Sequence, residues 1–339
     1  MVKLGMVSMA HVHARGYAEQ VRNHPDAELV AIWDEWPERG EGAAKDYGVP
    51  FIAALDEMLA LDGLQGVVVD APTNTHHDVI LRAVKAGKHV FTEKALSITT
   101  AESDEIVAAV EAAGIRFMVS LPSRCAPEIL LLRQLVDEGV LGDVTLMRAR
   151  IAHSAALGGG WFSGYSQWFA DPVAAGGGAL FDLGCHTVDV MRWLMGAPKS
   201  VTAKMNSFTK RYPDVDDNAV AVVEFATGAL GILDVAWVHA AGPNPIELYG
   251  TKGFVGLRGL NGRPTLMVQD AKYADRCSGE LLVTSLPSAL PTPMEQWVAA
   301  IESGSEMTIT VRDGRNLTEL LEGIYRSARE GRSIDFPLT

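Results

Sequence analysis

A carboxylate and an imidazole stand four residues apart in the segment Gly176–His186, which reads GGGALFDLGCH. At that spacing Asp182 and His186 lie on one face of a helix. Far upstream, Lys94 follows an apolar run at residues 89–92 that has the pattern of a strand. An acid, a histidine and a lysine can together move a proton to or from a reacting hydroxyl group. We interpret the three residues as a proton-handling site assembled from two domains, which suggests a hydride-transferring oxidoreductase.

The bulk composition limits the classes of protein and of partner. A length of 339 residues predicts two domains, and 48% hydrophobic residues can fill two cores. The balance of 29 basic against 42 acidic residues repels phosphate backbones and anionic lipid, so we expect neither nucleic acid nor a membrane as a partner. Cys125, Cys185 and Cys277 are widely spaced, which indicates neither a disulfide framework nor a zinc site. Because we recognise no export signal or apolar span, we expect a cytoplasmic protein.

The first part of the chain alternates short apolar runs with longer helical patterns, which is typical of βαβ units and a parallel sheet. Thr99 and Glu102 have the spacing of a capping box at the start of the last helix in this part. The predicted strands are residues 3–7, 28–33, 66–70, 89–92 and 116–120, and the predicted helices are residues 14–21, 36–47, 76–86 and 100–113. We therefore predict an α/β domain over residues 1–122.

Strand patterns dominate the second part of the chain, residues 123–339. Two of them flank Thr227-Gly228 and have the pattern of an antiparallel hairpin. The predicted strands are residues 144–152, 218–225, 229–238 and one that reaches 249–253, and the predicted helices are residues 127–138, 294–303 and 315–330. We predict an α+β domain on a large, open, mainly antiparallel sheet.

The loop after the first strand is the weak point of a dinucleotide-binding interpretation. The usual G-x-G-x-x-G fingerprint is replaced, since its glycine positions hold Ser8, Ala10 and His13. Asp34 restores the signal, because it ends the second strand near the offset expected for an acid that binds the adenosine ribose. An acid there repels a 2′-phosphate. With Glu35 and a tryptophan following and no arginine alongside, we expect NAD rather than NADP, although Asp34 as a simple turn or capping residue stays an alternative.

Two histidine pairs raise the question of a metal. His11 and His13 form an H-x-H pair, and His76 and His77 are adjacent. Zinc requires three or four convergent ligands. Because neither pair has an evident third partner in the sequence, we predict no metal.

The motifs together resemble those of the Gfo/Idh/MocA oxidoreductases. The pieces that carry the resemblance are Ala71–His76 (APTNTH), Ala86–Lys94 (AGKHVFTEK) and Gly177–His186 (GGALFDLGCH). The middle piece is similar to the family's AGKHVxxEKP signature and the last to its GGGxLxDxGxH signature. The resemblance implies a Rossmann dinucleotide-binding domain over residues 1–122 and an α+β domain for substrate binding and oligomer formation over residues 123–339. It also implies that the nicotinamide lies in the cleft between them.

Carried over to this chain, the resemblance makes Lys94 the catalytic lysine and places Glu93 near the nicotinamide ribose. It makes Asp182 and His186 the acid and the histidine that face the substrate. A histidine suits the base that takes the hydroxyl proton, and a lysine suits the group that favours negative charge on the reacting oxygen. The expected cofactor-binding residues are Ser8, Met9, Ala10, His11, Asp34, Glu35, Ala71, Pro72, Thr73, Asn74, His76 and Glu93.

Two departures from the family pattern keep other functions open. Ala95 stands where the signature has proline, and the glycine fingerprint is absent. Some members act as regulators with little catalytic role, and others use transient redox chemistry to cleave glycosidic bonds. The three hypotheses are therefore an NAD(P)-dependent dehydrogenase acting on a sugar, cyclitol or related polyol, a non-catalytic nucleotide-binding regulator, and a redox-assisted glycosidase or lyase.

Aromatic and polar residues downstream are candidates for the substrate wall. Aromatic faces stack on sugar rings, and polar tips pair with hydroxyl groups. The candidates are Arg124, His153, Trp161, Tyr165 and Trp168. The alternative is that the tryptophans pack a long loop or serve an interface, and Arg124 has the further alternative of binding a carboxylate. We expect a homo-oligomer, a dimer or tetramer, formed through the sheet of the second domain.

Overall fold

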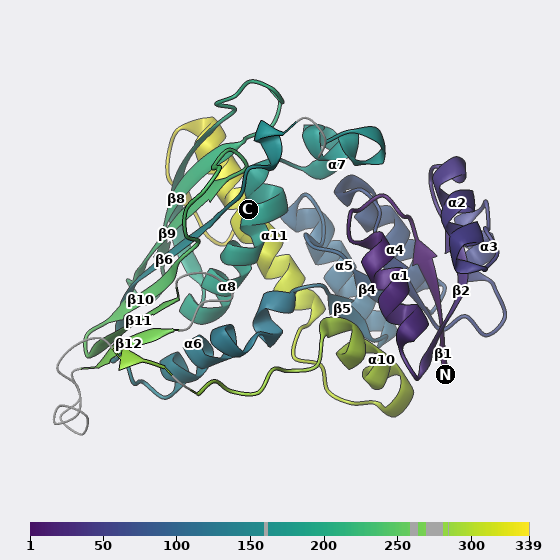
Figure 1. Ribbon diagram of the computed structural model, residues 1–339, viewed down its shortest axis with the longest axis horizontal. Coiled ribbons are helices and arrows are strands. Elements are labelled where there is room, and N and C mark those ends of the chain that lie inside the picture. Colours follow the sequence, from purple (N-terminus) through teal and green to yellow (C-terminus); the bar gives the residue numbers. More distant parts are fainter. Residues whose placement is uncertain (159–161, 258–263, 269–280, 284, 339) are drawn as a thin grey trace. The chain divides into compact units, whose positions relative to one another are not determined.

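The computed structural model describes the whole chain except residues 159–161, 258–263, 269–280, 284 and 339 (Figure 1). The chain forms two compact units that are not continuous in sequence. The first consists of residues 1–121, 162–176 and 291–318, and the second of residues 122–161, 177–290 and 319–339. The division into domains at residues 122/123 stays a prediction, and two later segments return to the first unit.

The first unit is built on a five-stranded sheet in the order β2-β1-β3-β4-β5, in which all neighbours are parallel (Figure 1). The strands are β1 (Val2–Val7), β2 (Ala27–Trp33), β3 (Gly66–Val69), β4 (His89–Thr92) and β5 (Phe117–Val119). The predicted parallel α/β domain is confirmed. Because the strand order reverses between β1 and β3, the carboxyl ends of these two strands form the position at which such sheets bind ligands.

Helices follow the strands of the first unit as predicted. They are α1 (Ala14–Asn23), α2 (Pro37–Tyr47), α3 (Leu55–Leu59), α4 (His76–Lys85) and α5 (Thr100–Ala113). The capping box is present, with the Thr99 side chain accepting from the Glu102 amide and the Glu102 carboxylate accepting from the Thr99 amide. The five-residue α3 has no counterpart among the predicted helices, because a single turn carries too little periodicity to recognise.

The two returning segments complete the first unit. They carry η4 (Gly164–Ala170), α7 (Pro172–Ala175), α10 (Pro293–Ser303) and the start of α11 (Val311–Glu330). α10 contacts β1, β4 and β5. Its Trp297 is fully buried with its ring 5.8 Å from that of Phe91, and its indole N–H donates to the Arg116 carbonyl at 3.2 Å. The sheet is therefore covered by a helix encoded far from it in the sequence.

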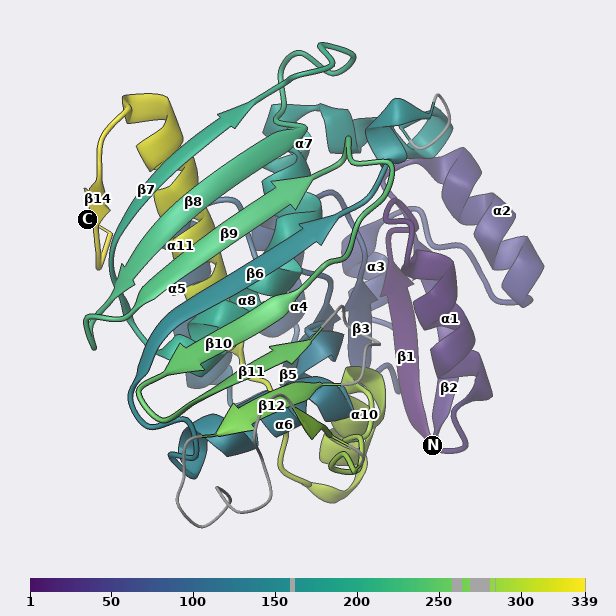
Figure 2. The ribbon, with the colours of Figure 1, turned by 60° about the vertical axis from the view of Figure 1, so that its left-hand side comes forward.

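The second unit is built on a nine-stranded sheet in the order β13-β12-β11-β10-β6-β9-β8-β7-β14 (Figure 2). Neighbouring strands are antiparallel except β6 and β9, which are parallel. The predicted hairpin is confirmed as β8 and β9. The strands are β6 (Val144–Ala152), β7 (Pro198–Asn206), β8 (Asn218–Phe225), β9 (Leu230–Ala236), β10 (Ile246–Gly250), β11 (Gly253–Leu257), β12 (Thr265–Val268), β13 (Leu281–Leu282) and β14 (Ile334–Asp335).

Helices cover one face of this sheet and leave the other open (Figure 2). α8 (Cys185–Met195) packs on β6 and β9, and α6 (Pro127–Asp137) packs on α8. On the open face, Val220, Val222 and Leu230 are exposed. Among the described residues, no helix has the length and apolar content needed to cross a bilayer.

Candidate active site

The loop between β1 and α1 keeps the backbone of a glycine turn without the glycine. Ser8 stands at the first fingerprint position with φ of 73°, in the left-handed region that favours glycine. Its amide donates to the Trp33 carbonyl at 2.7 Å, and its hydroxyl accepts from the Ala10 amide at 3.1 Å. The hydroxyl thus supports the turn that a phosphate-binding loop before a helix requires, so the loop fits a dinucleotide.

Asp34 directly follows β2, as predicted, and its side chain is buried. One carboxylate oxygen accepts from the Met9 amide at 2.8 Å and the other from the Trp36 amide at 2.6 Å. The acid is therefore fixed against the loop that follows β1, which is the arrangement expected beside an adenosine ribose.

An arginine lies beside Asp34, contrary to our expectation. Arg39 in α2 donates from Nε and from one terminal nitrogen to the two oxygens of Asp34, each at 2.8 Å, and also to Glu35 at 2.6 Å. Burial opposes the charge of Arg39, but Asp34 and Glu35 outweigh burial and hold the pKa of Arg39 above its usual value. Arg39 was not predicted to pair with Asp34, because it is five residues away in the sequence and the first turn of α2 folds it back.

Two of the expected substrate-wall residues lie in the first unit instead. The ring of Tyr165 lies 5.2 Å from that of Trp36, and the Arg39 guanidinium lies over it. The Trp168 indole donates to the Ala10 carbonyl at 3.2 Å. Both belong to the segment that returns to this unit and packs on the loop after β1, and their substrate-binding role stays a prediction. Trp161 lies outside the described residues.

The segment after β3 is organised by His76. Its ring nitrogens lie 3.0 Å from the carbonyl oxygens of Ala71 and Ala95, and the side chain is buried. Burial lowers the pKa of His76, and the carbonyl groups only partly offset it. His76 thus joins the turn after β3 to the turn after Lys94, and its expected contact with the cofactor stays a prediction. Of the other residues predicted here, Ala71 and Thr73 are buried, Pro72 is half-buried and Asn74 is exposed.

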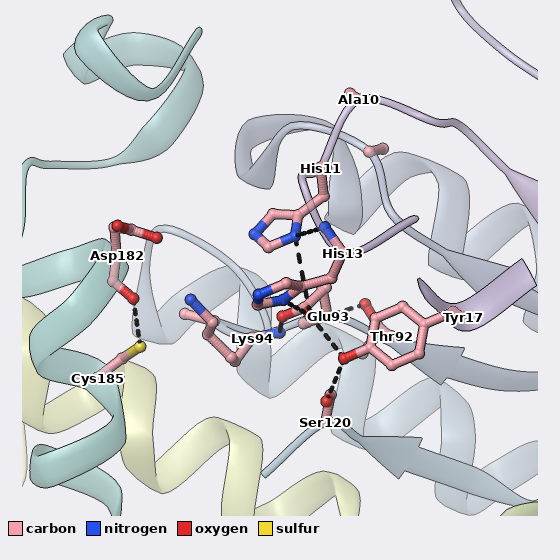
Figure 3. A network of polar contacts seen from close by, with 12 residues as sticks. Ala10, His11, His13, Tyr17, Thr92, Glu93, Lys94, Ser120, Asp182 and Cys185 are labelled. Atoms are coloured by element: carbon pink, nitrogen blue, oxygen red, sulfur yellow. Dashed lines mark hydrogen bonds and ion pairs between the residues drawn. The ribbon is translucent and has the colours of Figure 1, made fainter. Parts of the chain in front are cut away.

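Glu93 directly follows β4 and is the centre of a polar network (Figure 3). One carboxylate oxygen accepts from the Tyr17 hydroxyl and lies 2.7 Å from His13 Nδ1, and the other accepts from the Lys94 amide at 2.8 Å. Burial raises the pKa of Glu93, but the charges of His11 and Lys94 and the bond to His13 prevail and hold it well below its usual value. The buried Glu93 is therefore an anion beside the buried Lys94.

Three further residues of this network were not among the predicted site residues. The Tyr17 hydroxyl lies 2.6 Å from the Ser120 hydroxyl, and burial, then Glu93 and Asp70, raise the pKa of Tyr17 well above its usual value. Asp70 follows β3 and is fully buried. Tyr17 lies on the buried face of α1. The sequence pattern could therefore predict that Tyr17 is buried, but not that its hydroxyl group joins a polar network.

In the second unit, Asp182 and His186 lie on consecutive helical turns. Asp182 is in the π-helical turn η5 (Leu180–Gly184), and His186 is in the first turn of α8. Both are half-buried. The Cys185 thiol donates to the Asp182 carbonyl at 2.9 Å (Figure 3). Single π-helical turns are frequent at functional sites, and the catalytic role of this pair stays a prediction.

Asp216 holds the start of the segment that carries Asp182, and it was not among the predicted site residues. Its carboxylate accepts from the Gly178 amide at 2.8 Å, the Leu180 amide at 2.9 Å and the Tyr325 hydroxyl at 2.6 Å. A Cβ at Gly178 would lie 2.0 Å from the Asp216 carbonyl oxygen. The glycine run before Asp182 is therefore needed for close approach to Asp216.

His153 is electrostatically coupled to Asp182. Its Nδ1 accepts from the Ala155 amide at 3.1 Å, which leaves the proton of the neutral ring on Nε2. Burial lowers the pKa of His153, and the Asp182 carboxylate partly offsets this. The expected substrate-binding role of His153 stays a prediction.

Arg124 is part of the framework of the second unit. Its guanidinium is buried and bonds both oxygens of Asp189, at 2.9 and 2.6 Å, and it lies over the ring of Trp193. A bidentate pair of this kind uses the directional donors that would otherwise recognise a substrate carboxylate. The structure therefore gives Arg124 a structural partner, and its expected substrate-binding role stays a prediction.

Comparison with protein families identifies both parts of the chain. Residues 2–121 match the model of the oxidoreductase family with an NAD-binding Rossmann fold, and residues 129–255 match the GFO/IDH/MocA C-terminal domain. The chain belongs to the GFO/IDH/MocA family. The predictions of a Rossmann domain, an oxidoreductase and NAD as the cofactor are confirmed.

Relatives of known activity match over most of their length. The chain is 27% identical to inositol 2-dehydrogenase of Rhizobium meliloti over 340 residues, 98% of each protein. It is 28% identical to scyllo-inositol 2-dehydrogenase (NAD(+)) of Bacillus subtilis, over 74% of this chain and 71% of that protein. The crystal structure of GenD2 from gentamicin A biosynthesis, in complex with NAD, is similar with a TM-score of 0.81 at 28% identity and covers 99% of this chain and 97% of GenD2.

Proposed function

We propose that this protein is an NAD-dependent dehydrogenase that transfers hydride between nicotinamide and a secondary alcohol or ketone carbon of a sugar, cyclitol or related polyol. The similarity to inositol dehydrogenases supports the substrate class. The observation that carries the proposal is the half-buried pair Asp182 and His186, which Asp216 holds in place and to which His153 is electrostatically coupled.

Each catalytic residue has one role in this proposal. When bound, NAD supplies the hydride acceptor at nicotinamide C4. His186 takes the hydroxyl proton as general base, because a neutral imidazole titrates near physiological pH. The Lys94 ammonium group donates to the reacting oxygen and favours its developing negative charge. Asp182 binds a neighbouring hydroxyl group. The Glu93 anion holds the backbone of Lys94 through the Lys94 amide.

The first unit supplies the residues that would hold NAD. We assign the pyrophosphate to the loop Ser8–His11, because it precedes the N-terminus of α1. Asp34, with Glu35 and Arg39 at its side, would meet the adenosine ribose. The turn Ala71–Asn74 and Glu93 would border the nicotinamide ribose.

A polyol screen tests the proposal. We expect NADH formation with at least one sugar or cyclitol, and its loss in Lys94→Ala. Lys85→Ala, which changes an exposed lysine of α4, is the matched control and should keep full activity. Cofactor binding without turnover on any polyol would favour the regulator, and cleavage of a glycoside without net NADH formation would favour the glycosidase or lyase.

We also propose a cytoplasmic homo-oligomer formed by the open face of the nine-stranded sheet. Its apolar residues Val220, Val222 and Leu230 are exposed on neighbouring strands, and a second copy of this face is the occupant that would bury them. Val222→Lys should lower the mass measured by analytical ultracentrifugation. Val173→Lys, an exposed valine of α7, is the control, and an unchanged mass in Val222→Lys would contradict this interface.

A further inference from the structure

Three metal-ligating side chains meet in the first unit (Figure 3). His11 lies in the loop after β1, His13 precedes α1, and Glu93 follows β4. One candidate donor atom from each lies within 4.8 Å of the donors of the other two. We propose that His11, His13 and Glu93 form a binding site for one divalent transition-metal ion of the zinc class. The sequence analysis found no third partner for the H-x-H pair, because Glu93 is eighty residues from His13.

The distances suit such an ion. His13 Nδ1 and His11 Nδ1 lie 2.7 and 3.8 Å from the same oxygen of Glu93. Two donors bound to a tetrahedral zinc at about 2.0–2.1 Å each lie roughly 3.3 Å apart. The two observed distances lie on either side of that value. Each of the two distances would have to change by about half an ångström, and an ion at His11 Nδ1 would replace the hydrogen bond that this nitrogen accepts from the His13 amide at 3.2 Å.

Hydrogen bonds from residues other than the two histidines hold the carboxylate of Glu93. The Tyr17 hydroxyl donates to the oxygen shared with the histidines, and the Lys94 amide donates to the other oxygen. Tyr17 is in turn bonded to Ser120. Metal-ligating carboxylates are typically held by such partners, which fix the ligand before the ion arrives.

A buried acid, Asp70, interacts with Glu93, whereas the charge of Lys94 beside Glu93 opposes a cation. Asp70 is fully buried, and neither of its carboxylate oxygens has a hydrogen-bond partner within the described part of the chain. It follows β3, the strand next to β4, and interacts electrostatically with both Glu93 and Tyr17. A buried carboxyl group without a partner is costly. A divalent ion at Glu93 would lower the cost of both acidic groups.

The donor set limits which ions fit. Two imidazoles and one carboxylate suit zinc, cobalt or iron(II), whereas calcium and magnesium prefer oxygen ligands. The His13 side chain is half exposed, which leaves a path for the ion and room for water at a fourth position. Because His11 lies in the loop assigned to NAD, ion and NAD binding must affect each other equally.

Titration of the chelator-treated, NAD-free, full-length protein with Co²⁺ and Zn²⁺ tests the site. We expect one ion per chain by calorimetry and the visible absorption of four-coordinate Co²⁺. His13→Ala should lower the affinity at least about tenfold, because it removes one of three protein ligands. Glu93→Gln should have the same effect.

A matched control distinguishes this site from general histidine binding. His77 lies at the start of α4, away from the three ligands, and pairs with Glu105. The variant His77→Ala should therefore bind Co²⁺ as the wild type does. His13 is half exposed, so His13→Ala keeps the test informative if Glu93→Gln does not fold. The absence of saturable binding, or unchanged binding in His13→Ala, would overturn the proposal. Neither outcome depends on the polyol screen.

Discussion

Arg39 neutralises Asp34, the acid that was expected to exclude NADP. The guanidinium bonds both carboxylate oxygens and also lines a hollow of about 380 Å³ with Arg15, Lys45 and Tyr165. The negative charge of Asp34 is therefore largely compensated where the adenosine ribose is expected. We therefore expect cofactor selectivity to depend on the pair and not on the acid alone.

Replacing Arg39 should strengthen the preference for NAD. In Arg39→Met, the uncompensated Asp34 carboxylate repels a 2′-phosphate, so we expect the ratio of NADP to NAD dissociation constants to rise at least about tenfold, or roughly 1.4 kcal/mol. Fluorescence titration with each cofactor measures the ratio. Arg82→Met, at an arginine paired with Asp56 on the surface, is the control. An unchanged ratio in Arg39→Met would show that Arg39 does not act on this phosphate position.

His186 should affect turnover far more than cofactor binding. His186 is the proposed general base, so its replacement in His186→Asn should lower kcat by about 10²- to 10⁴-fold. The dissociation constant of NAD should stay within a factor of about two, because His186 lies outside the dinucleotide-type unit. Steady-state kinetics on an active polyol and a separate NAD titration give the two values. Equal losses in both would indicate a folding defect instead of a catalytic role.

Asp216→Asn should destabilise the second unit. An amide cannot accept from both the Gly178 and the Leu180 amides, because its NH2 group faces one of the two donors. We expect the free energy of unfolding to fall by about 1–3 kcal/mol, the usual cost of leaving a buried polar group unsatisfied. Chemical denaturation measures it. Asp214→Asn, two residues away and exposed, should leave stability unchanged.

The contribution of Asp216 to stability should also depend on pH. Burial raises its pKa in the native state, although Tyr325 and the two amides oppose the shift. Between the ordinary value and the raised one, the native state holds a proton that the unfolded state has lost, so stability falls as pH rises through this window. The free-energy difference between wild type and Asp216→Asn should therefore be largest at the acid end. If the free-energy difference between the two proteins grew with pH instead, the pKa of Asp216 would be lowered and not raised in the native state.

The elements that follow from local pattern were predictable. The apolar runs of β1 to β5, the capping box at Thr99 and the spacing of Asp182 and His186 depend only on neighbours in the sequence. Asp34 was found for the same reason, since its offset from the loop is fixed by one βαβ unit.

The relationships that the sequence did not reveal join distant residues. Glu93 becomes the partner of His13 only when β4 and β1 enter the same sheet, and Asp216 reaches Gly178 only when the second unit folds. The place of Tyr165 and Trp168 in the first unit was not predictable, because nothing in their own segment indicates that the chain returns. Side-chain pairs of this kind depend on tertiary structure and leave no periodic signal.

The interleaved path of the chain has a practical consequence for protein engineering. Cutting after residue 121 would remove α10 and expose the core around Phe91 to which Trp297 is packed. A dinucleotide module excised in that way lacks part of its own hydrophobic interior. Chimaeras with relatives must therefore exchange the three stretches of this unit together, and not the amino-terminal stretch alone.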